Sequence, residues 1–518
     1  MSEKTLIPKT SSDAAINLAL DTLKIKKQAL IFTNTKRSAE KTAEEISLKI
    51  KESSKELEEL SKQILNALSK PTKQCKRLAK CIKRGIAFHH AGLTHKQKEL
   101  IEDNFRKGLI KIICATPTLA MGVDIPAFRA ILKDLRRYGH YGLQWIPTLE
   151  YLQMAGRAGR PKFDKYGEAI AVAVTEEAKK EIYERYIKGE PEEIFSKLAV
   201  EPVLRTYLLS LIATNFVTDQ KSIIKFFSKT FWAFQYRDMH KLTSIILKML
   251  HLLEEFEFIQ SSEQEEFQSA AEMFNQKYKA TLIGKRVAEL YIDPLTAYYL
   301  ITSIKRANKK SINEFSFLQM ISHTLEMRPL LRVKTKEYDI IEKHILKNSD
   351  YMLEKEPSIY EPEYEEFLKS IKTSLFFQDW VNEKDEEYLL ETYNIRPGEI
   401  RVKLTLADWL LYASEELTRM IKLKRMIKEI IKLRIRLKQG VKEELLPLLK
   451  LEHIGRVRAR KLFKNKIKDI ADVKKVKVPT LIEILGEKIA LSVKEQVGQK
   501  VKIVPKGTRK GQTSIEKF

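Results

Sequence analysis

The first third of this 518-residue chain alternates short apolar runs with stretches of helical character. Each run is bounded by polar or glycine residues, which is typical of a buried strand. Strands that alternate with helices in this way predict a parallel α/β sheet. The predicted strands are ALIFTNT (29–35), GIAFHH (85–90), KIICATP (111–117), RAILKDL (129–135) and EAIAVAV (168–174).

Polar residues follow three of these predicted strands. Asn34, His90 and Thr116 lie at or just before the ends of their runs. The carboxyl ends of parallel strands meet at the same edge of a sheet, and ligand-binding loops lie there. We therefore expect these side chains to share one binding edge.

Beyond about residue 198 the pattern becomes mostly helical. The exception is a pair of predicted short strands, EFIQ (257–260) and YKATLIGKR (278–286), which follow amphipathic helices in the manner of a winged helix. Residues 296–440 are predicted to be all-helical and end in an amphipathic stretch with basic residues between its apolar positions. The basic segment after about residue 503 is predicted to be a frayed end.

The composition favours a polyanionic partner. Lys and Arg number 94 against 69 Asp and Glu, which gives a net charge of +25, and such an excess suits nucleic acid. A Lys-rich composition is equally typical of the ion-paired surface of a thermophilic protein. The three cysteines lack CxxC spacing, so we expect neither a metal site nor disulfides. No leader and no apolar run of about 20 residues is present, which predicts a cytoplasmic protein without membrane association.

Four motifs in a fixed order resemble the second half of superfamily two helicases of the Ski-like branch. They are ALIFTNTKRSAE, AFHHAGL, ATPTLAMGVDIPA and QMAGRAGRP. Later segments, EPVLRTYLLSLIA, LYIDPLTA and ADWLLYASEE, are similar to archaeal Hjm-type DNA repair helicases. The resemblance covers about residues 12 to 500. It implies a second RecA-like domain (1–190), a winged helix (191–295), a helical ratchet domain (296–440), a helix-hairpin-helix domain (441–502) and a flexible tail (503–518).

The resemblance implies an ATP site around QMAGRAGRP. Arg157 and Arg160 would face ATP bound by another RecA-like domain, where the outer arginine would neutralise charge on the γ-phosphoryl oxygens. Gln153 would help to orient the site. Gly122 would permit a tight turn after its strand, and Asp124 would contact the ribose or couple ATP to DNA. The structural alternatives are a solvated helix start for the arginines and a turn-capping role for Asp124.

The resemblance also implies a surface that follows the DNA backbone. Phosphate contacts are expected from Asn34, Thr35, Arg37, His90, Gly92 and Thr116. The segment LRRYGHYGLQWIP (135–147) resembles a β-hairpin that wedges between separating strands, with Tyr138 and Tyr141 as candidate stacking residues. A buried histidine at position 90 and a hairpin packed on its own domain are the alternatives.

A further DNA contact is implied in the ratchet domain. Trp409 would stack on a base of the tracking strand, although a helical tryptophan is more often part of a core. The family often has two adjacent arginines before this tryptophan. Here Val402 separates Arg401 from Lys403, which leaves open whether either of them binds phosphate.

The segment LEHIGRVRARKLFKN (451–465) resembles a helix-hairpin-helix. Gly455 would expose backbone amides to a phosphate, and Arg456, Arg458 and Arg460 would add positive charge. A solvated basic helix is the alternative.

The 518 residues contain neither a GxxxxGK[ST] loop nor a DExH motif for Mg²⁺. Residue 12 corresponds to the start of the second RecA-like domain, so we expect the first to be absent. The sequence therefore predicts the C-terminal subunit of a split ATP-dependent DNA helicase that acts on single-stranded, forked or branched DNA in repair. A separately encoded chain would hold most of the ATP and Mg²⁺, and the isolated chain would be inactive. The alternatives are a truncated product, an inactive remnant, a non-catalytic DNA-binding adaptor and part of an RNA-directed Ski-like helicase.

The last residues, KGQTSIEKF, resemble a peptide that docks on the PCNA sliding clamp. Gln512, Ile515 and Phe518 occupy its first, fourth and seventh positions, where the glutamine fits a polar pocket and the apolar residues a groove. A frayed basic tail is the alternative.

Overall fold

The computed structural model describes residues 5–68, 70–139, 142–160, 164–261 and 276–499. The chain divides into two compact units. The first unit contains residues 1–199, 227–239 and 386–403. The second unit contains residues 200–226, 240–385 and 404–518. Across the described ranges, no helix combines the length and the apolar character needed to cross a membrane.

The first unit is built on a five-stranded parallel sheet with the strand order β2-β3-β1-β4-β7. Its strands are β1 (Ala29–Phe32), β2 (Ile86–His89), β3 (Ile112–Ala115), β4 (Arg129–Leu132) and β7 (Glu168–Ala171). All five predicted strands form, each shorter than the run that predicted it. Ala29 of the central strand pairs with Ile112 on one side and with Arg129 on the other. The predicted parallel α/β sheet is therefore confirmed.

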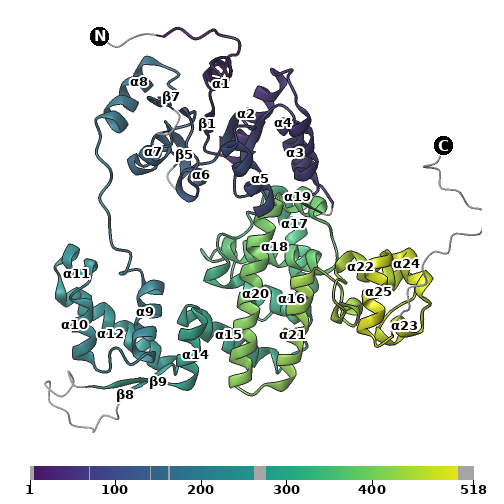
Figure 1. Cartoon of the computed structure of the whole chain (residues 1–518). Coiled ribbons are helices and arrows are strands. Elements are labelled where there is room, and N and C mark those ends of the chain that lie inside the picture. The colour runs from purple at the N-terminus through teal and green to yellow at the C-terminus, as the bar shows by residue number, and fades with distance from the viewer. Residues whose placement is uncertain (1–4, 69, 140–141, 161–163, 262–275, 500–518) are drawn as a thin grey trace, which may run out of the picture. The chain divides into compact units, whose positions relative to one another are not determined.

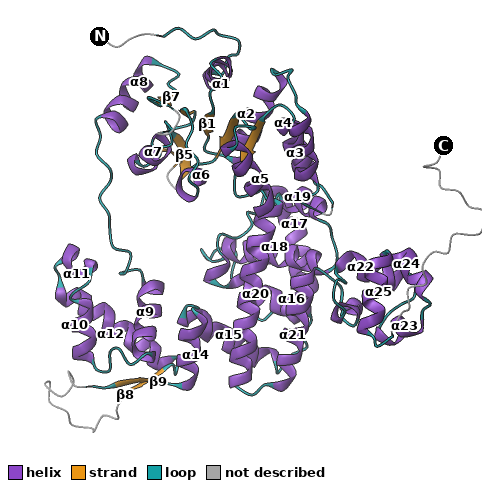
Figure 2. Ribbon diagram, viewed as in Figure 1, coloured by secondary structure: helices purple, strands orange, loops and turns teal. Residues whose placement is uncertain are grey.

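Helices connect these strands, as Figures 1 and 2 show. The first unit also contains helices outside these connections, α1 (Ala14–Lys24), α8 (Glu176–Ile182), α11 (Phe231–Tyr236) and α19 (Glu386–Tyr393). The connecting helices are α2 (Lys36–Leu48), α3 (Lys55–Leu65), α4 (Lys73–Ile82), α5 (His95–Arg106), α6 (Thr118–Gly122) and α7 (Thr148–Ala155). Thr35, Thr72 and Thr94 begin three of them by accepting a hydrogen bond from a backbone amide of the first turn.

A two-stranded hairpin follows the fourth sheet strand. It consists of β5 (Arg136–Gly139) and β6 (Gly142–Trp145), which pair antiparallel. The predicted hairpin is thus confirmed as a structural element.

The second unit is mostly helical. Its elements include α9 (Glu201–Ala213), α10 (Gln220–Phe227), α12 (Met239–Glu255), β8 (Ile259–Ser261), β9 (Tyr278–Ala280), α14 (Leu282–Leu290), α15 (Pro294–Ala307), α16 (Glu314–His323), α17 (Tyr338–Asn348) and α18 (Tyr364–Val381). They continue with α20 (Pro397–Met420), which starts in the first unit, α21 (Lys424–Gln439), α22 (Arg456–Lys464), α23 (Ile470–Lys475), α24 (Val478–Leu485) and α25 (Glu487–Gln496). The predicted helical character beyond the sheet is confirmed, whereas the division into winged helix, ratchet and helix-hairpin-helix stays a prediction.

One predicted strand in the second unit is mostly wrong. Residues 278–286 form a strand only as far as Ala280, which pairs with Ile259. The Thr281 hydroxyl then accepts a hydrogen bond from the Gly284 amide at 3.0 Å, which caps the start of α14. The remaining residues are therefore helical, and the apolar side chains of Val287 and Leu290 are buried.

Two glycines hold the arginine-bearing segment against the sheet. The Gly159 amide donates a hydrogen bond to the Ala127 carbonyl at 2.7 Å. Gly159 has a φ of +93°, and a Cβ on Gly167 would lie 2.2 Å from the Gly159 nitrogen. Glycine is therefore required at both positions, one for its backbone conformation and one for close approach.

We expect Gly167→Ala to destabilise the protein by about 1–3 kcal/mol, because the added methyl overpacks this contact. Urea denaturation measures the effect. Gly122→Ala is the matched control, since nothing lies within 4 Å of its Cβ position and its φ is not positive. Equal stability of Gly167→Ala and the control would contradict the close packing.

Candidate nucleotide and nucleic-acid site

Arg157 follows the carboxyl end of α7 and joins it to the loop before β4. Its Nε donates to the Ala120 carbonyl at 3.1 Å, and one terminal nitrogen donates to Asp124 Oδ1 at 3.2 Å. The Asp124 side chain is otherwise 94% exposed. Gln153 is also exposed, on the last turn of α7. The structure thus brings Arg157 and Asp124 into contact at the protein surface.

Arg160 is held by a buried carboxylate. Its Nε and one terminal nitrogen donate to the two oxygens of Asp164 at 2.7 and 3.1 Å, and the other terminal nitrogen donates to Gln28 Oε1 at 2.7 Å. The Asp164 side chain is 1% exposed and also pairs with Lys27. The hydrogen bond from Arg160 lowers the pKa of Asp164 to about 2, although burial alone would raise it. A phosphate would have to compete with this carboxylate for Arg160.

Gly122 does not have the role in a tight turn that we predicted. It is the last residue of the short helix α6, its φ is not positive, and nothing lies within 4 Å of its Cβ position. The turn that needs glycine lies instead at Gly159. A nucleotide contact by the exposed Gly122 stays a prediction.

The loop after β1 connects to the hairpin. Asn34 Nδ2 donates to the Arg136 carbonyl, and the Asn34 amide donates to Asp134 Oδ2 at 3.3 Å. Thr35 and Arg37 are exposed and line a pocket of about 370 Å³ together with Lys133. This edge therefore presents polar groups and positive charge to solvent.

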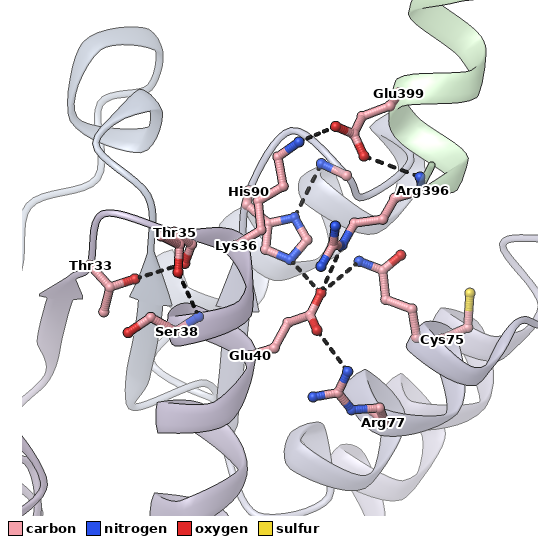
Figure 3. Close-up of polar contacts among 12 residues, drawn as sticks. Thr33, Thr35, Lys36, Ser38, Glu40, Cys75, Arg77, His90, Arg396 and Glu399 are labelled. Carbon is pink, nitrogen blue, oxygen red and sulfur yellow. Dashed lines mark hydrogen bonds and ion pairs between the residues drawn. The ribbon is translucent and has the colours of Figure 1, made fainter. Parts of the chain in front are cut away.

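A buried carboxylate lies behind this edge (Figure 3). Glu40 is 3% exposed on α2. It accepts hydrogen bonds from His90 Nε2 at 3.1 Å, Arg396 Nε at 3.1 Å and Arg77 at 2.7 Å. Burial would raise the pKa of Glu40, but the hydrogen bond from His90 and the charges of Arg396 and Arg77 outweigh it and lower this pKa to about 2. Glu40 is therefore ionised and fully engaged.

His90 is a buried turn histidine. Its Nδ1 accepts a hydrogen bond from the Gly92 amide at 3.1 Å, and its ring is fully buried. Burial lowers the pKa of His90, so the neutral ring donates from Nε2 and accepts at Nδ1. Both nitrogens are occupied within the protein, so the structure agrees with the alternative to a phosphate contact by this side chain.

The start of α20 packs on the same turn. The Gly398 amide donates to the Gly92 carbonyl at 3.0 Å, and a Cβ on Gly398 would lie 2.3 Å from the Ala91 carbonyl oxygen. Glu399 pairs with Lys36 at the start of α2. Gly92 is thus covered by residues 396–399. Thr116 is almost fully buried as well, with its hydroxyl 3.0 Å from that of Thr118.

Glu40 and Arg396 are not among the site residues that the sequence predicts. Glu40 occupies the buried face of α2 next to Ala39 and Ala43. A charged residue on an apolar stripe was the available signal, because such a group requires partners. No local pattern indicates Arg396, which lies 356 residues further along the chain.

The hairpin is packed at its base and exposed towards its tip. Trp145 lies under the Arg136 guanidinium at 4.0 Å and donates from Nε1 to Glu181 at 2.6 Å. Tyr138 is 84% exposed. Tyr141 lies outside the described residues. Stacking of Tyr138 on a base pair stays a prediction.

The candidate contacts on α20 differ in exposure. Trp409 is half-buried, and its Nε1 donates to the Leu290 carbonyl at 3.1 Å. Arg401 is exposed and pairs with Glu386 at 3.0 Å. Lys403 is buried, and this burial lowers its pKa to about 8 despite the nearby Glu399 carboxylate. Of the two basic residues, Arg401 is therefore the more accessible to a phosphate.

The arginines of the predicted helix-hairpin-helix have internal acceptors. Arg456 donates to the Lys384 carbonyl at 2.7 Å, and Arg458 donates to the His453 carbonyl at 2.8 Å. Arg460 is paired with Glu383 and Glu444, so its charge is largely used within the protein. Gly455 precedes α22 with nothing within 4 Å of its Cβ position, which leaves space beside the first amides of this helix. Gln512, Ile515 and Phe518 lie outside the described residues.

Comparison with known proteins assigns the family. The description "Helicase conserved C-terminal domain" matches residues 59–162, and "Archaeal helicase, domain 4" matches residues 315–440. The chain is 39% identical over 502 residues to the ATP-dependent DNA helicase Hel308 of Pyrococcus horikoshii, which covers 95% of this chain and 67% of the relative. The chain belongs to the Hel308 family. Hel308 of Methanocella arvoryzae is 35% identical over 534 residues, or 100% of this chain and 70% of the relative.

Membership of the Hel308 family confirms the coarser prediction. Its relatives are named as ATP-dependent DNA helicases, and they come from archaea such as Methanococcus vannielii, whose Hel308 is 37% identical over 522 residues. The resemblance to archaeal superfamily two helicases is therefore correct at the level of the family. The Hjm type and the separate first domain stay predictions.

We expect Glu40→Gln to destabilise the protein by about 3 kcal/mol at pH 7, because a carboxyl pKa that falls from 4.5 to about 2 on folding contributes an energy of that order. This stability is present above pH 4.5 and is lost as the pH falls from 4.5 towards 2. The difference between wild type and variant should therefore shrink in urea denaturation experiments below pH 4.5.

The partly exposed Glu45 on the same helix supplies the control, since it pairs with Lys41 at 3.6 Å in the contact described for it. Glu45→Gln should change stability by no more than about 0.5 kcal/mol. If the difference in unfolding free energy between wild type and Glu40→Gln stayed constant down to pH 3, it would contradict the assignment of Glu40 as ionised.

Proposed function

We propose that this chain supplies the DNA path and the trans arginines of an ATP-dependent DNA helicase that unwinds forked or branched DNA during repair. The observation that carries the proposal is the contact of Arg157 with Asp124, in a chain of the Hel308 family that has Arg160 three residues further along. Guanidinium groups in such a position neutralise charge that develops on a transferring phosphoryl group.

This chain supplies residues that could contact only one end of ATP. Arg157 and Arg160 both bind carboxylates in this structure. A phosphate also offers negatively charged oxygens that accept hydrogen bonds from a guanidinium group. Gln153 is exposed close by in sequence. The phosphate-binding loop and the acidic Mg²⁺ motif are not among the 518 residues. We therefore infer that a RecA-like domain from outside this sequence holds most of the nucleotide and Mg²⁺.

The DNA would run along the carboxyl edge of the sheet. Asn34, Thr35 and Arg37 would bind phosphates there, supported by the exposure of Arg37 and by the contact of Asn34 with the hairpin. Gly92 and Thr116 are buried with their backbone groups paired, so they would support this surface instead of binding phosphate. Small polar groups and amides suit a surface that binds any sequence.

The second unit would also bind DNA. We infer a winged helix around the two-stranded sheet of β8 and β9, a ratchet domain containing Trp409, and a helix-hairpin-helix around Gly455. The family match over residues 315–440 supports the proposed ratchet domain. A sliding clamp is the proposed partner of the terminal residues.

Purified alone, the chain should bind single-stranded DNA and hydrolyse no ATP. Mixed with the first RecA-like domain of a Hel308 relative, it should become a DNA-stimulated ATPase. Arg160→Ala should then reduce turnover by about 10³-fold or more, as removal of an arginine finger does, while leaving nucleotide binding intact.

The control is Arg106→Ala, because Arg106 is exposed on α5 and pairs with Asp103 in its own helix. It should leave turnover unchanged. Robust ATP hydrolysis by the chain alone would overturn the proposed split. Failure of every mixture to hydrolyse ATP, with DNA binding intact, would favour the DNA-binding adaptor.

A further inference from the structure

A groove lies at the amino edge of the sheet, opposite the edge at which Asn34, His90 and Thr116 follow their strands. Its lining includes Lys27, Gly85 and Lys111, which come just before β1, β2 and β3. Because these strands are parallel, the residues that precede them share one edge. The groove encloses about 880 Å³. It shares Leu57, Leu109 and Lys111 with a neighbouring depression of about 930 Å³ along α3.

The apolar part of this amino-edge groove is aliphatic. It is formed by Leu20 and Leu23 of α1, Ile50 after α2, Leu57 of α3 and Leu109. Leu20, Leu23, Ile50 and Leu109 are only partly buried and pack against the core of the first unit. No aromatic side chain is among the lining residues that the structure describes. The groove therefore offers aliphatic surface without a platform for stacking.

The rim of the groove is basic. Its cationic side chains come from four different segments of the chain: Lys24, Lys26, Lys49, Lys51, Arg84 and Lys111. The contacts given for two of them are to backbone carbonyls, since Lys49 donates to Thr10 and Arg84 to Lys51. Among the described lining residues Glu52 is the one acid. Lys27 is partly neutralised by its pair with Asp164.

We propose that the amino-edge groove binds an acidic, amphipathic segment of a partner protein. Carboxylates of such a segment would meet the basic rim, and its aliphatic side chains would cover the apolar floor, as in other complexes in which an amphipathic helix lies in a groove. The volume lies in the usual range for binding sites, about 300–1,000 Å³.

Single-stranded nucleic acid fits this groove less well. Proteins that bind single strands without sequence preference stack the bases on aromatic side chains, and the described lining has none. The groove lies at the edge opposite to the proposed DNA path, and its contact with the proposed ATP site is through Lys27, which shares Asp164 with Arg160. A partner and DNA could therefore be held together.

Fluorescence anisotropy tests the proposal with a labelled 16-residue peptide that carries leucine at helical spacing and glutamate elsewhere. We expect the full chain to bind it, more weakly at high salt. The double variant Lys24→Glu plus Lys111→Glu should weaken binding by about tenfold or more, as expected when interfacial charges are reversed. Ile50→Ser should also weaken binding without a change in charge, and a thermal melt checks that each variant is folded.

The control is Lys62→Glu plus Lys80→Glu. These lysines are exposed on α3 and α4 and do not line the groove. The control substitutions should leave binding of the peptide unchanged. The groove substitutions should leave binding of a dT16 oligonucleotide unchanged. Equal losses in the groove and control variants would mean attraction to the overall positive charge and would overturn the proposal. Loss of dT16 binding in the groove variants would assign the groove to nucleic acid instead. Absence of peptide binding, or equal binding of a peptide with serine in place of leucine, would also overturn it.

Discussion

The buried carboxylate of Glu40 organises the carboxyl edge of the sheet. An ionised group in the interior is costly unless charged and hydrogen-bonding partners surround it. Here the partners are His90, Arg396 and Arg77, which come from the turn after β2, the start of α20 and helix α4. Three segments that are distant in sequence must therefore meet at one point for the carboxylate to be satisfied.

The orientation of the turn after β2 follows from this arrangement. The Nε2 of His90 is fixed by Glu40, which leaves Nδ1 to accept the Gly92 amide. Gly398 then fits against the turn because it lacks a side chain. Some of the residues that the sequence predicts as DNA contacts therefore have a structural role. His90 is buried and fixes the turn, whereas Thr35 and Arg37 are exposed to solvent at the same edge.

The parallel topology gives the two edges of the sheet different chemistry. Its carboxyl edge carries the polar residues that follow β1, β2 and β3 and the hairpin contact through Asn34. The arginine segment lies at the amino edge of the sheet, because Gly159 bonds to Ala127 before β4 and Arg160 bonds to Gln28 before β1. The amino edge also carries lysines over an aliphatic floor. A single sheet thus separates the proposed nucleic-acid surface from the proposed protein-binding groove, since the ends of parallel strands lie on opposite sides.

Much of this architecture could be predicted from local sequence. The five strands and the hairpin follow from short apolar runs and from glycines at the turn, and the family motifs indicate the arginines and the polar edge. The sequence predicts residues 278–286 as a strand that follows amphipathic helices, but the cap at Thr281 starts α14 within this segment. Arg160 lies in the motif QMAGRAGRP, but its partner Asp164 lies beyond the motif, and the pair is further held by Lys27 and Gln28 from another part of the chain.

Contacts over long sequence distances could not be predicted. Residues 386–403 belong to the first unit although they lie beyond most of the second, and the contact of Arg396 with Glu40 has no local signature. The same holds for the amino-edge groove, which is assembled from segments before three strands. Such features depend on which elements meet in space, and a single sequence does not contain that information in its periodicity.

The central claim is that DNA follows the carboxyl edge of the sheet in the first unit. Hydrogen-deuterium exchange of the chain with and without single-stranded DNA tests it most directly. The account predicts slower exchange in peptides that span residues 33–38 and 116–124, with no change at residues 84–86 and 109–111 of the amino edge. Protection of the amino edge, with unchanged exchange at the carboxyl edge, would contradict it.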